Sequence, residues 1–143
     1  MERVKEDNSE AQRSGLLALS HMAYRTPETF HLYMTPAHRK EVLPYLVEGM
    51  DHPEVGVRIR FIELLGHLRE RSVVPELTRL LEHDNPTIRQ FAATALGRIG
   101  DGRAIPPLMQ MEANDPAQDQ TGHYYLRERA RDALAQIRTG NPG

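Results

Sequence analysis

A spacing of 31 residues, found twice along the chain, limits the possible folds more than any other feature. Proline follows an apolar residue at Pro44, Pro75 and Pro106, and 31 positions separate each of these prolines from the next. After each proline come an Asp/Asn-rich turn, then an apolar residue followed by arginine, then a leucine followed by a small residue. Because three segments keep these landmarks in one order, the chain is predicted to be a repeat protein, with each segment forming one structural unit.

Each unit is predicted to contain two helices. In the second helix, apolar residues stand at positions i, i+4, i+7, i+8 and i+11 from Val57 to Leu68, which is the stripe of an amphipathic helix. Residues 88–99 and 126–137 repeat this stripe. The first helices are expected over residues 36–49, 72–83 and 103–113. The Asp and Asn residues before Pro53, Pro86 and Pro116 are expected to cap the second helices.

A pair of amphipathic helices cannot bury its apolar stripe alone, so the units are expected to stack on one another. The sequence therefore predicts an all-α solenoid of about three complete helical hairpins plus a partial N-terminal repeat, in one domain over residues 1–143. The predicted plan is a partial repeat at 8–23, an inserted segment at 24–35, repeats at 36–71, 72–102 and 103–138, and a tail at 139–143.

The segment from Asp84 to Leu108 resembles a known repeat family. It carries Asp-x-Pro, then apolar-Arg, then Ala-x-x-Ala-Leu-Gly-x-Ile-Gly-Asp-x-Arg-Ala-Ile and a final Pro-Leu. This pattern is similar to the short HEAT-like repeat of the phycobilisome-lyase type. The resemblance implies a right-handed HEAT-like solenoid. It leaves function open, because such repeats occur in chromophore lyase subunits, adaptors and hydroxylases. The His-Glu pairs that mark the iron-binding hydroxylases of this class are missing from the sequence.

The composition argues against several classes of function. The chain has no cysteine, so disulfides and thiolate metal sites are excluded, and its formal net charge of −2 lacks the basic excess typical of duplex-binding domains. No apolar run approaches the length of a membrane span, and the charged N-terminus lacks the apolar stretch of a signal peptide. We expect a cytoplasmic protein that uses no cofactor and no metal and does not bind membranes.

The polar stripe of the second helices is the predicted partner-binding surface, since in a solenoid these helices line the concave face. The alternative is an ordinary solvated face. Two equivalent histidines of this stripe, His21 and His67, could bind a metal, but a catalytic site usually needs a third protein ligand, so none is predicted. The predicted binding residues are His21, Ile59, Glu63, His67, Gln90, Thr94, Arg98, Glu128, Asp132 and Gln136.

Two further groups of residues have alternative interpretations. The arginines that recur at one position of the repeat are expected to form a structural ladder with aspartates of the turns and neighbouring carbonyls, the alternative being an anion-binding column. The ladder residues are Arg58, Arg89, Arg127, Asp51, Asp84 and Asp115. On the inserted loop, His123, Tyr124 and Tyr125 are candidate partner contacts or a lid over the terminal core.

These features together predict a non-enzymatic protein-binding scaffold or adaptor. Its partner is expected to be another protein, and self-association through terminal repeats stays open. The alternatives are an accessory subunit of a bilin lyase-type enzyme, by analogy with the family, and a nucleic-acid-binding HEAT-like protein. For the latter, the basic cluster of the last helix is interrupted by Glu128 and Asp132, whereas a nucleic-acid-binding surface normally carries one sign of charge.

Overall fold

The computed structural model describes residues 35–140, and this part of the chain is all-α, with no strand. No helix in it combines the length and the apolar character needed to cross a membrane. The chain divides into two compact units, residues 1–64 and residues 65–143. The helices are α3 (Pro36–Gly49), α4 (Val55–Leu68), α5 (Val74–Leu80), α6 (Pro86–Ile99), α7 (Ile105–Asn114) and α8 (Tyr125–Thr139).

In the first unit, α3 occupies the predicted residues 36–49. The Thr35 side chain caps it by accepting a hydrogen bond from the His38 amide at 3.2 Å. The ring of Phe61 in α4 packs against Gly49, where any side chain would collide with it. The predicted partial repeat at 8–23, the inserted segment up to residue 34 and His21 lie outside the described residues.

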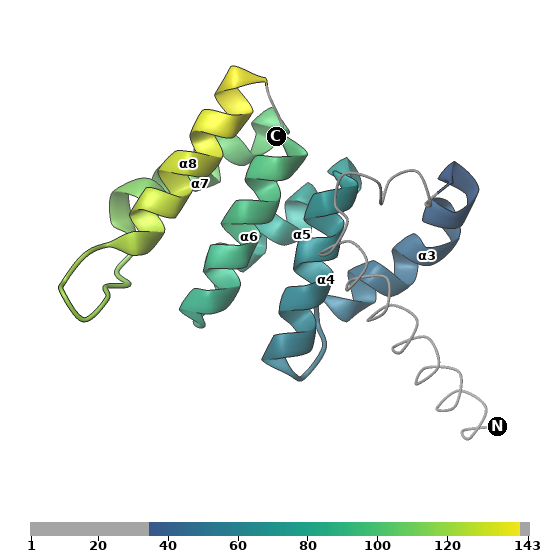
Figure 1. Ribbon diagram of the computed structural model, residues 1–143, viewed down its shortest axis with the longest axis horizontal. Coiled ribbons are helices and arrows are strands. Elements are labelled where there is room, and N and C mark those ends of the chain that lie inside the picture. Colours follow the sequence, from purple (N-terminus) through teal and green to yellow (C-terminus); the bar gives the residue numbers. More distant parts are fainter. Residues whose placement is uncertain (1–34, 141–143) are drawn as a thin grey trace. The chain divides into compact units, whose positions relative to one another are not determined.

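In the second unit the helices form two layers (Figure 1). α6 packs along α8 in one layer, while α5 packs on α6 and α7 packs on α8 from behind. The short 3₁₀ turns Arg71–Val73 and Gly102–Ala104 lead into α5 and α7. α5 with α6 and α7 with α8 thus form two helical hairpins, each with a first helix in one layer and a second helix in the other.

The predicted apolar stripes are the buried faces of the second helices. Each stripe residue of α6 and α8 is at most 8% exposed, and together they make up half of the buried apolar residues of this unit. Burial of these side chains is the main favourable term in holding the layers together. The buried stripe residues are Ile88, Ala92, Ala95, Leu96 and Ile99 of α6 and Leu126, Ala130, Ala133, Leu134 and Ile137 of α8.

Helix boundaries were predicted correctly where the signal was local. Pro75 and Pro106 stand in the first turns of α5 and α7, where a missing N–H removes no helical bond. Asn85 caps α6 through a 2.8 Å bond from the Thr87 amide, and Gly100 ends it with φ 75°, the left-handed conformation that glycine adopts without strain.

The capping prediction was wrong for the other two second helices. The Asp115 carboxylate does accept the Ala117 amide, at 3.0 Å, but a loop follows this turn and α8 begins only at Tyr125. α4 begins at Val55, and the side-chain bond in the turn before it comes from the Glu54 amide to His52 Nδ1 at 3.0 Å. The first helix expected over residues 72–83 is also shorter, since α5 ends at Leu80.

Small residues bring the second helices close together. A Cβ atom placed on Gly66, in the last turn of α4, would stand 3.0 Å from the Cα and Cβ atoms of Ala95. A Cβ atom on Gly97 of α6 would stand 3.0 Å from Ala133 Cα in α8. The same contact thus recurs along the array, and it needs glycine on one helix and alanine on the next because larger side chains would separate them.

Adding a side chain at this contact should destabilise the fold. We expect Gly97→Leu to lower the free energy of unfolding by about 1–3 kcal/mol, because the new atoms overlap Ala133. Gly56→Leu is the matched control, since nothing lies within 4 Å of the added Cβ in the first turn of α4. Denaturant titration followed by circular dichroism measures both. Equal losses for the two variants would contradict the packing argument.

Candidate functional site

The second unit contains seven of the ten predicted partner-binding residues. They lie on α6, on α8 and in the last turn of α4, and we call this surface the α6/α8 face. Ile59 and Glu63 belong to the first unit, and His21 is outside the described residues. The residues of the face are His67, Gln90, Thr94 and Arg98, which are partly exposed, and Glu128, Asp132 and Gln136, which are exposed.

His67 and Arg98 contact each other across the face. Arg98 Nη1 lies 3.3 Å from His67 Nε2, although 31 residues separate them in sequence. A guanidinium can only donate, so Nε2 accepts, and the imidazole is neutral with its proton on Nδ1. The side chain of Gln136 lies nearby, against Gly97. The structure therefore brings together polar groups from three successive second helices.

The pKa of His67 lies below its ordinary value of about 6.5, chiefly because partial burial penalises the charged imidazole. The positive charge of Arg98 lowers it further. Because the folded pKa is depressed, the unfolded chain binds more protons just below the ordinary value. The contribution of the neutral imidazole to the free energy of unfolding is therefore complete above about pH 6.5. It is lost as the pH falls through the folded pKa.

The two causes of the lowered pKa of His67 can be separated by removing one of them. We expect Arg98→Ala to raise the pKa of His67 only part of the way to its ordinary value, because burial is the larger cause. The imidazole signals of His67, followed by NMR over a pH titration, report this value directly. Full recovery of the ordinary pKa in the variant would show that burial does not dominate.

The hydroxyl of Thr94, also on α6, is less available. Thr94 Oγ1 donates to the Gln90 carbonyl at 3.1 Å, within α6 itself. Such a bond occupies the hydroxyl proton locally. The most exposed polar residues of the face are Glu128, Asp132 and Gln136 of α8.

The loop at residues 115–124 folds onto the start of α8. His123 Nε2 lies 2.7 Å from Glu128 Oε2, and the Arg127 guanidinium stacks 3.7 Å from the centre of the Tyr124 ring. Tyr125 is the first residue of α8. The candidate contacts on this loop are thus held by neighbouring residues of the same hairpin.

Sequence reasoning missed the residue that organises this loop. Asp119 Oδ1 accepts the Thr121 amide at 2.8 Å, the Thr121 hydroxyl at 2.6 Å and the His123 amide at 3.1 Å. The Thr121 bonds, followed by the His123 amide bond, lower the pKa of Asp119. The available signal was Asp-x-Thr-Gly, a pattern typical of side-chain-capped turns.

The recurring arginines all reach toward turns that precede or adjoin their own helices. Arg58 Nε donates to the Met50 carbonyl at 2.7 Å, and Arg127 Nε donates to the Asp115 carbonyl at 2.9 Å. Arg89 Nη1 donates to the carbonyls of His83 and Asp84 at 2.8 and 3.1 Å. In each repeat a guanidinium thus satisfies backbone acceptors where the chain changes direction.

Arg89 also forms the most buried ion pair described. Its Nε and Nη2 lie 2.9 and 3.2 Å from the two carboxylate oxygens of Asp115, and the two side chains are 11% and 4% exposed. This is the paired geometry in which a planar guanidinium matches a carboxylate. The pair connects the start of α6 to the end of α7.

Removing one partner of this ion pair should destabilise the protein more than removing both partners. We expect Asp115→Ala and Arg89→Met each to lower the free energy of unfolding by about 3 kcal/mol, because each leaves a buried group unpaired. The double variant should lose less than the sum of the two. Denaturant unfolding of all four proteins closes the cycle, and simple additivity would mean that the two charges are not coupled.

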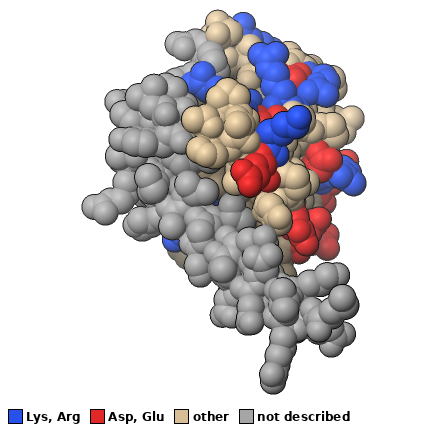
Figure 2. Space-filling view, turned by 90° about the vertical axis from the view of Figure 1, so that its right-hand side faces the viewer, with Lys and Arg blue, Asp and Glu red and all other residues tan. Residues whose placement is uncertain are grey.

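Figure 2 shows the side of the molecule that lies at the right in Figure 1. On this side, basic and acidic side chains of the described residues lie interspersed, and no single sign of charge dominates. Such a surface does not provide the continuous positive strip that follows a nucleic-acid backbone. Within residues 35–140, no group of three His, Asp or Glu side chains is arranged to hold a metal ion.

A family model described as HEAT repeats matches residues 43–135, which is more than half of the chain. The chain belongs to the HEAT repeat family. A search of curated proteins finds no match. HEAT repeats generally mediate protein–protein interactions and are typically not enzymes. The finer resemblance to the phycobilisome-lyase type stays a prediction.

Proposed function

We propose that this protein is a non-enzymatic scaffold whose protein partner docks on the α6/α8 face. The observation that carries the proposal is the hydrogen bond from Arg98 to His67, on a face where Asp132 of α8 is also exposed. The imidazole accepts a hydrogen bond from the guanidinium and so restricts its movement. A fixed cation on a face that also carries an exposed acid offers a partner both signs of charge, which favours specific recognition.

The rigidity of the supporting helices strengthens this proposal. The contact of Gly97 with Ala133 holds α6 and α8 at one separation, so their outward side chains keep a constant spacing. A binding site on rigid elements loses less conformational entropy when the partner binds. The partner is another protein, and a second copy of this chain is one candidate that the experiment below would detect.

The test compares two double variants with the same charge change. Arg98→Ala with Asp132→Ala removes one cation and one anion from the α6/α8 face. The control, Arg79→Ala with Glu112→Ala, removes one cation and one anion from α5 and α7. Both are used to capture partners from the native host, and the affinity for each captured protein is then measured. We expect the first variant to bind at least about tenfold more weakly than the second.

Circular dichroism of each variant checks that the fold is intact. If both variants retain the same partners with the same affinity, the α6/α8 face is not the binding surface. If weakening occurs only with the α5 and α7 variant, the partner docks on the other layer.

A further inference from the structure

Two histidines occupy the same place in successive repeats, and both act as hydrogen-bond acceptors. His52 and His83 are 31 residues apart, which is the spacing of the repeat. His52 Nδ1 accepts the Glu54 amide at 3.0 Å, and His83 Nδ1 accepts the Asn85 amide at 3.0 Å. A backbone amide can only donate, so in both rings Nδ1 carries no proton and the imidazole is neutral.

Both amides belong to the residue directly before a second helix. Glu54 precedes Val55, the first residue of α4, and its carbonyl accepts the Arg58 amide at 3.1 Å. Asn85 caps α6, and its carbonyl accepts the Arg89 amide at 3.2 Å. Each imidazole therefore holds the residue whose carbonyl accepts the first backbone bond of the helix.

The third repeat has a carboxylate in this role. Asp115 Oδ1 accepts the Ala117 amide at 3.0 Å, again from two residues further along the chain. Ordinary aspartate side chains gain a proton near pH 4 and ordinary imidazoles near about pH 6.5, so a carboxylate still accepts hydrogen bonds in mild acid. Two of the three turns thus depend on a type of side chain that titrates close to neutral pH, and the third does not.

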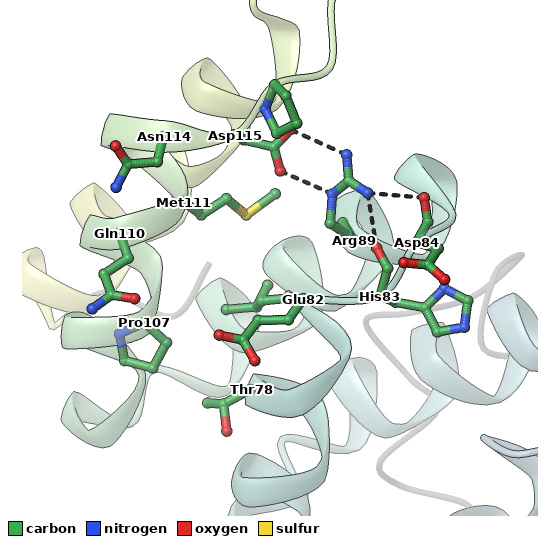
Figure 3. Close-up of a pocket in the computed structure, with 12 residues that line it drawn as sticks. Thr78, Glu82, His83, Asp84, Arg89, Pro107, Gln110, Met111, Asn114 and Asp115 are labelled. Carbon is green, nitrogen blue, oxygen red and sulfur yellow. Dashed lines mark hydrogen bonds and ion pairs between the residues drawn. The ribbon is translucent and has the colours of Figure 1, made fainter.

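The charged groups around His83 come from its own turn, from α6 and from the end of α7 (Figure 3). Among the described residues, it lines a groove of about 530 Å³ between α5 and α7 together with Glu82, Asp84, Arg89 and Asp115. Arg89 binds the His83 carbonyl at 2.8 Å and forms the ion pair with Asp115. Glu82 and Asp84 favour a charged imidazole, whereas Arg89 and the positive start of α6 oppose it.

The charged groups next to His52 follow the same plan. Asp51 and Glu54 belong to its own turn, and Arg58 of α4 donates to the Met50 carbonyl at 2.7 Å, directly after α3. The start of α4 opposes a positive charge as the start of α6 does. In both repeats the imidazole thus shares its turn with acids and with an arginine of the following helix.

We propose that these two turns form an acid-sensitive switch at the starts of α4 and α6. A proton on Nδ1 of His52 or His83 removes the acceptor, because a protonated nitrogen can only donate. The amide of Glu54 or Asn85 is then released, while the turn at Asp115 keeps its bond. The switch acts in the turns, so it goes beyond the proposed function and holds whichever surface binds the partner.

The first experiment follows the hydrogen bonds directly by NMR in the whole, isotope-labelled chain. A bond between two nitrogens gives a scalar coupling across it, here between the Asn85 amide nitrogen and His83 Nδ1. We expect this coupling, and the equivalent one from Glu54 to His52, at about pH 8 and its loss at about pH 5. The Ala117 amide is the internal control, and its chemical shift should change little between these pH values.

The second experiment assigns the response to one ring. Asparagine accepts the amide two residues further on and does not titrate, so His83→Asn should keep its turn closed in acid. At about pH 5 we expect the Arg89 amide to exchange with solvent about fivefold faster in the wild type than in His83→Asn, as expected for one hydrogen bond.

The matched control is His67→Gln. His67 is also a neutral acceptor, but it lies in the last turn of α4, away from the start of either helix. In this variant the Arg89 amide should exchange as fast as in the wild type at the same pH, and the Asn85 amide should keep its response to acid.

Three results would overturn the proposal. Absence of the couplings at about pH 8 would show that the imidazoles are not acceptors. An unchanged acid response of the Asn85 amide in His83→Asn would assign that response to another group. A change at Ala117 as large as that at Asn85 would indicate that acid affects the whole unit. Circular dichroism checks that each variant is folded, and the couplings in the wild type need no variant.

Discussion

The close contact between successive second helices determines most of what the second unit presents to its surroundings. Gly66 meets Ala95, and Gly97 meets Ala133, at distances that only small residues permit. The helices α6 and α8 are therefore held side by side, and polar groups of neighbouring helices come within hydrogen-bonding distance. The pair formed by Arg98 and His67 is a direct consequence, since it joins residues on two helices.

The first helices, α5 and α7, have larger side chains between them than α6 and α8 have. α5 and α7 each pack on a second helix, and the side chains between them include Leu81, Met111 and Pro107. These residues are too large for the close approach seen in the other layer. Small residues thus bring α6 and α8 together in one layer, whereas larger side chains in the other layer border a groove of about 530 Å³ between α5 and α7. The two surfaces differ in charge as well, because the groove is acidic and the α6/α8 face carries both signs.

The turns between helices are held by charge as well as by packing. A guanidinium from the first turns of each second helix binds backbone carbonyls nearby, and Arg89 adds the buried carboxylate of Asp115. A buried ion pair contributes little net stability over apolar packing, but its two parallel bonds link the start of α6 to the end of α7. The same Asp115 also accepts the Ala117 amide in the first turn of the loop that precedes α8, so one carboxylate contacts both α6 and the loop.

The sequence by itself determined the helical repeat, the buried stripes, the cap at Asn85 and the left-handed end of α6 at Gly100, because each depends on residues within a few positions of one another. It also indicated which residues lie on the outer face of the second helices. Only the tertiary structure decided the pairing of His67 with Arg98 and the groove between α5 and α7. These features depend on how closely helices from different repeats approach, which is set by side-chain volume at their contacts and leaves no local pattern in the sequence.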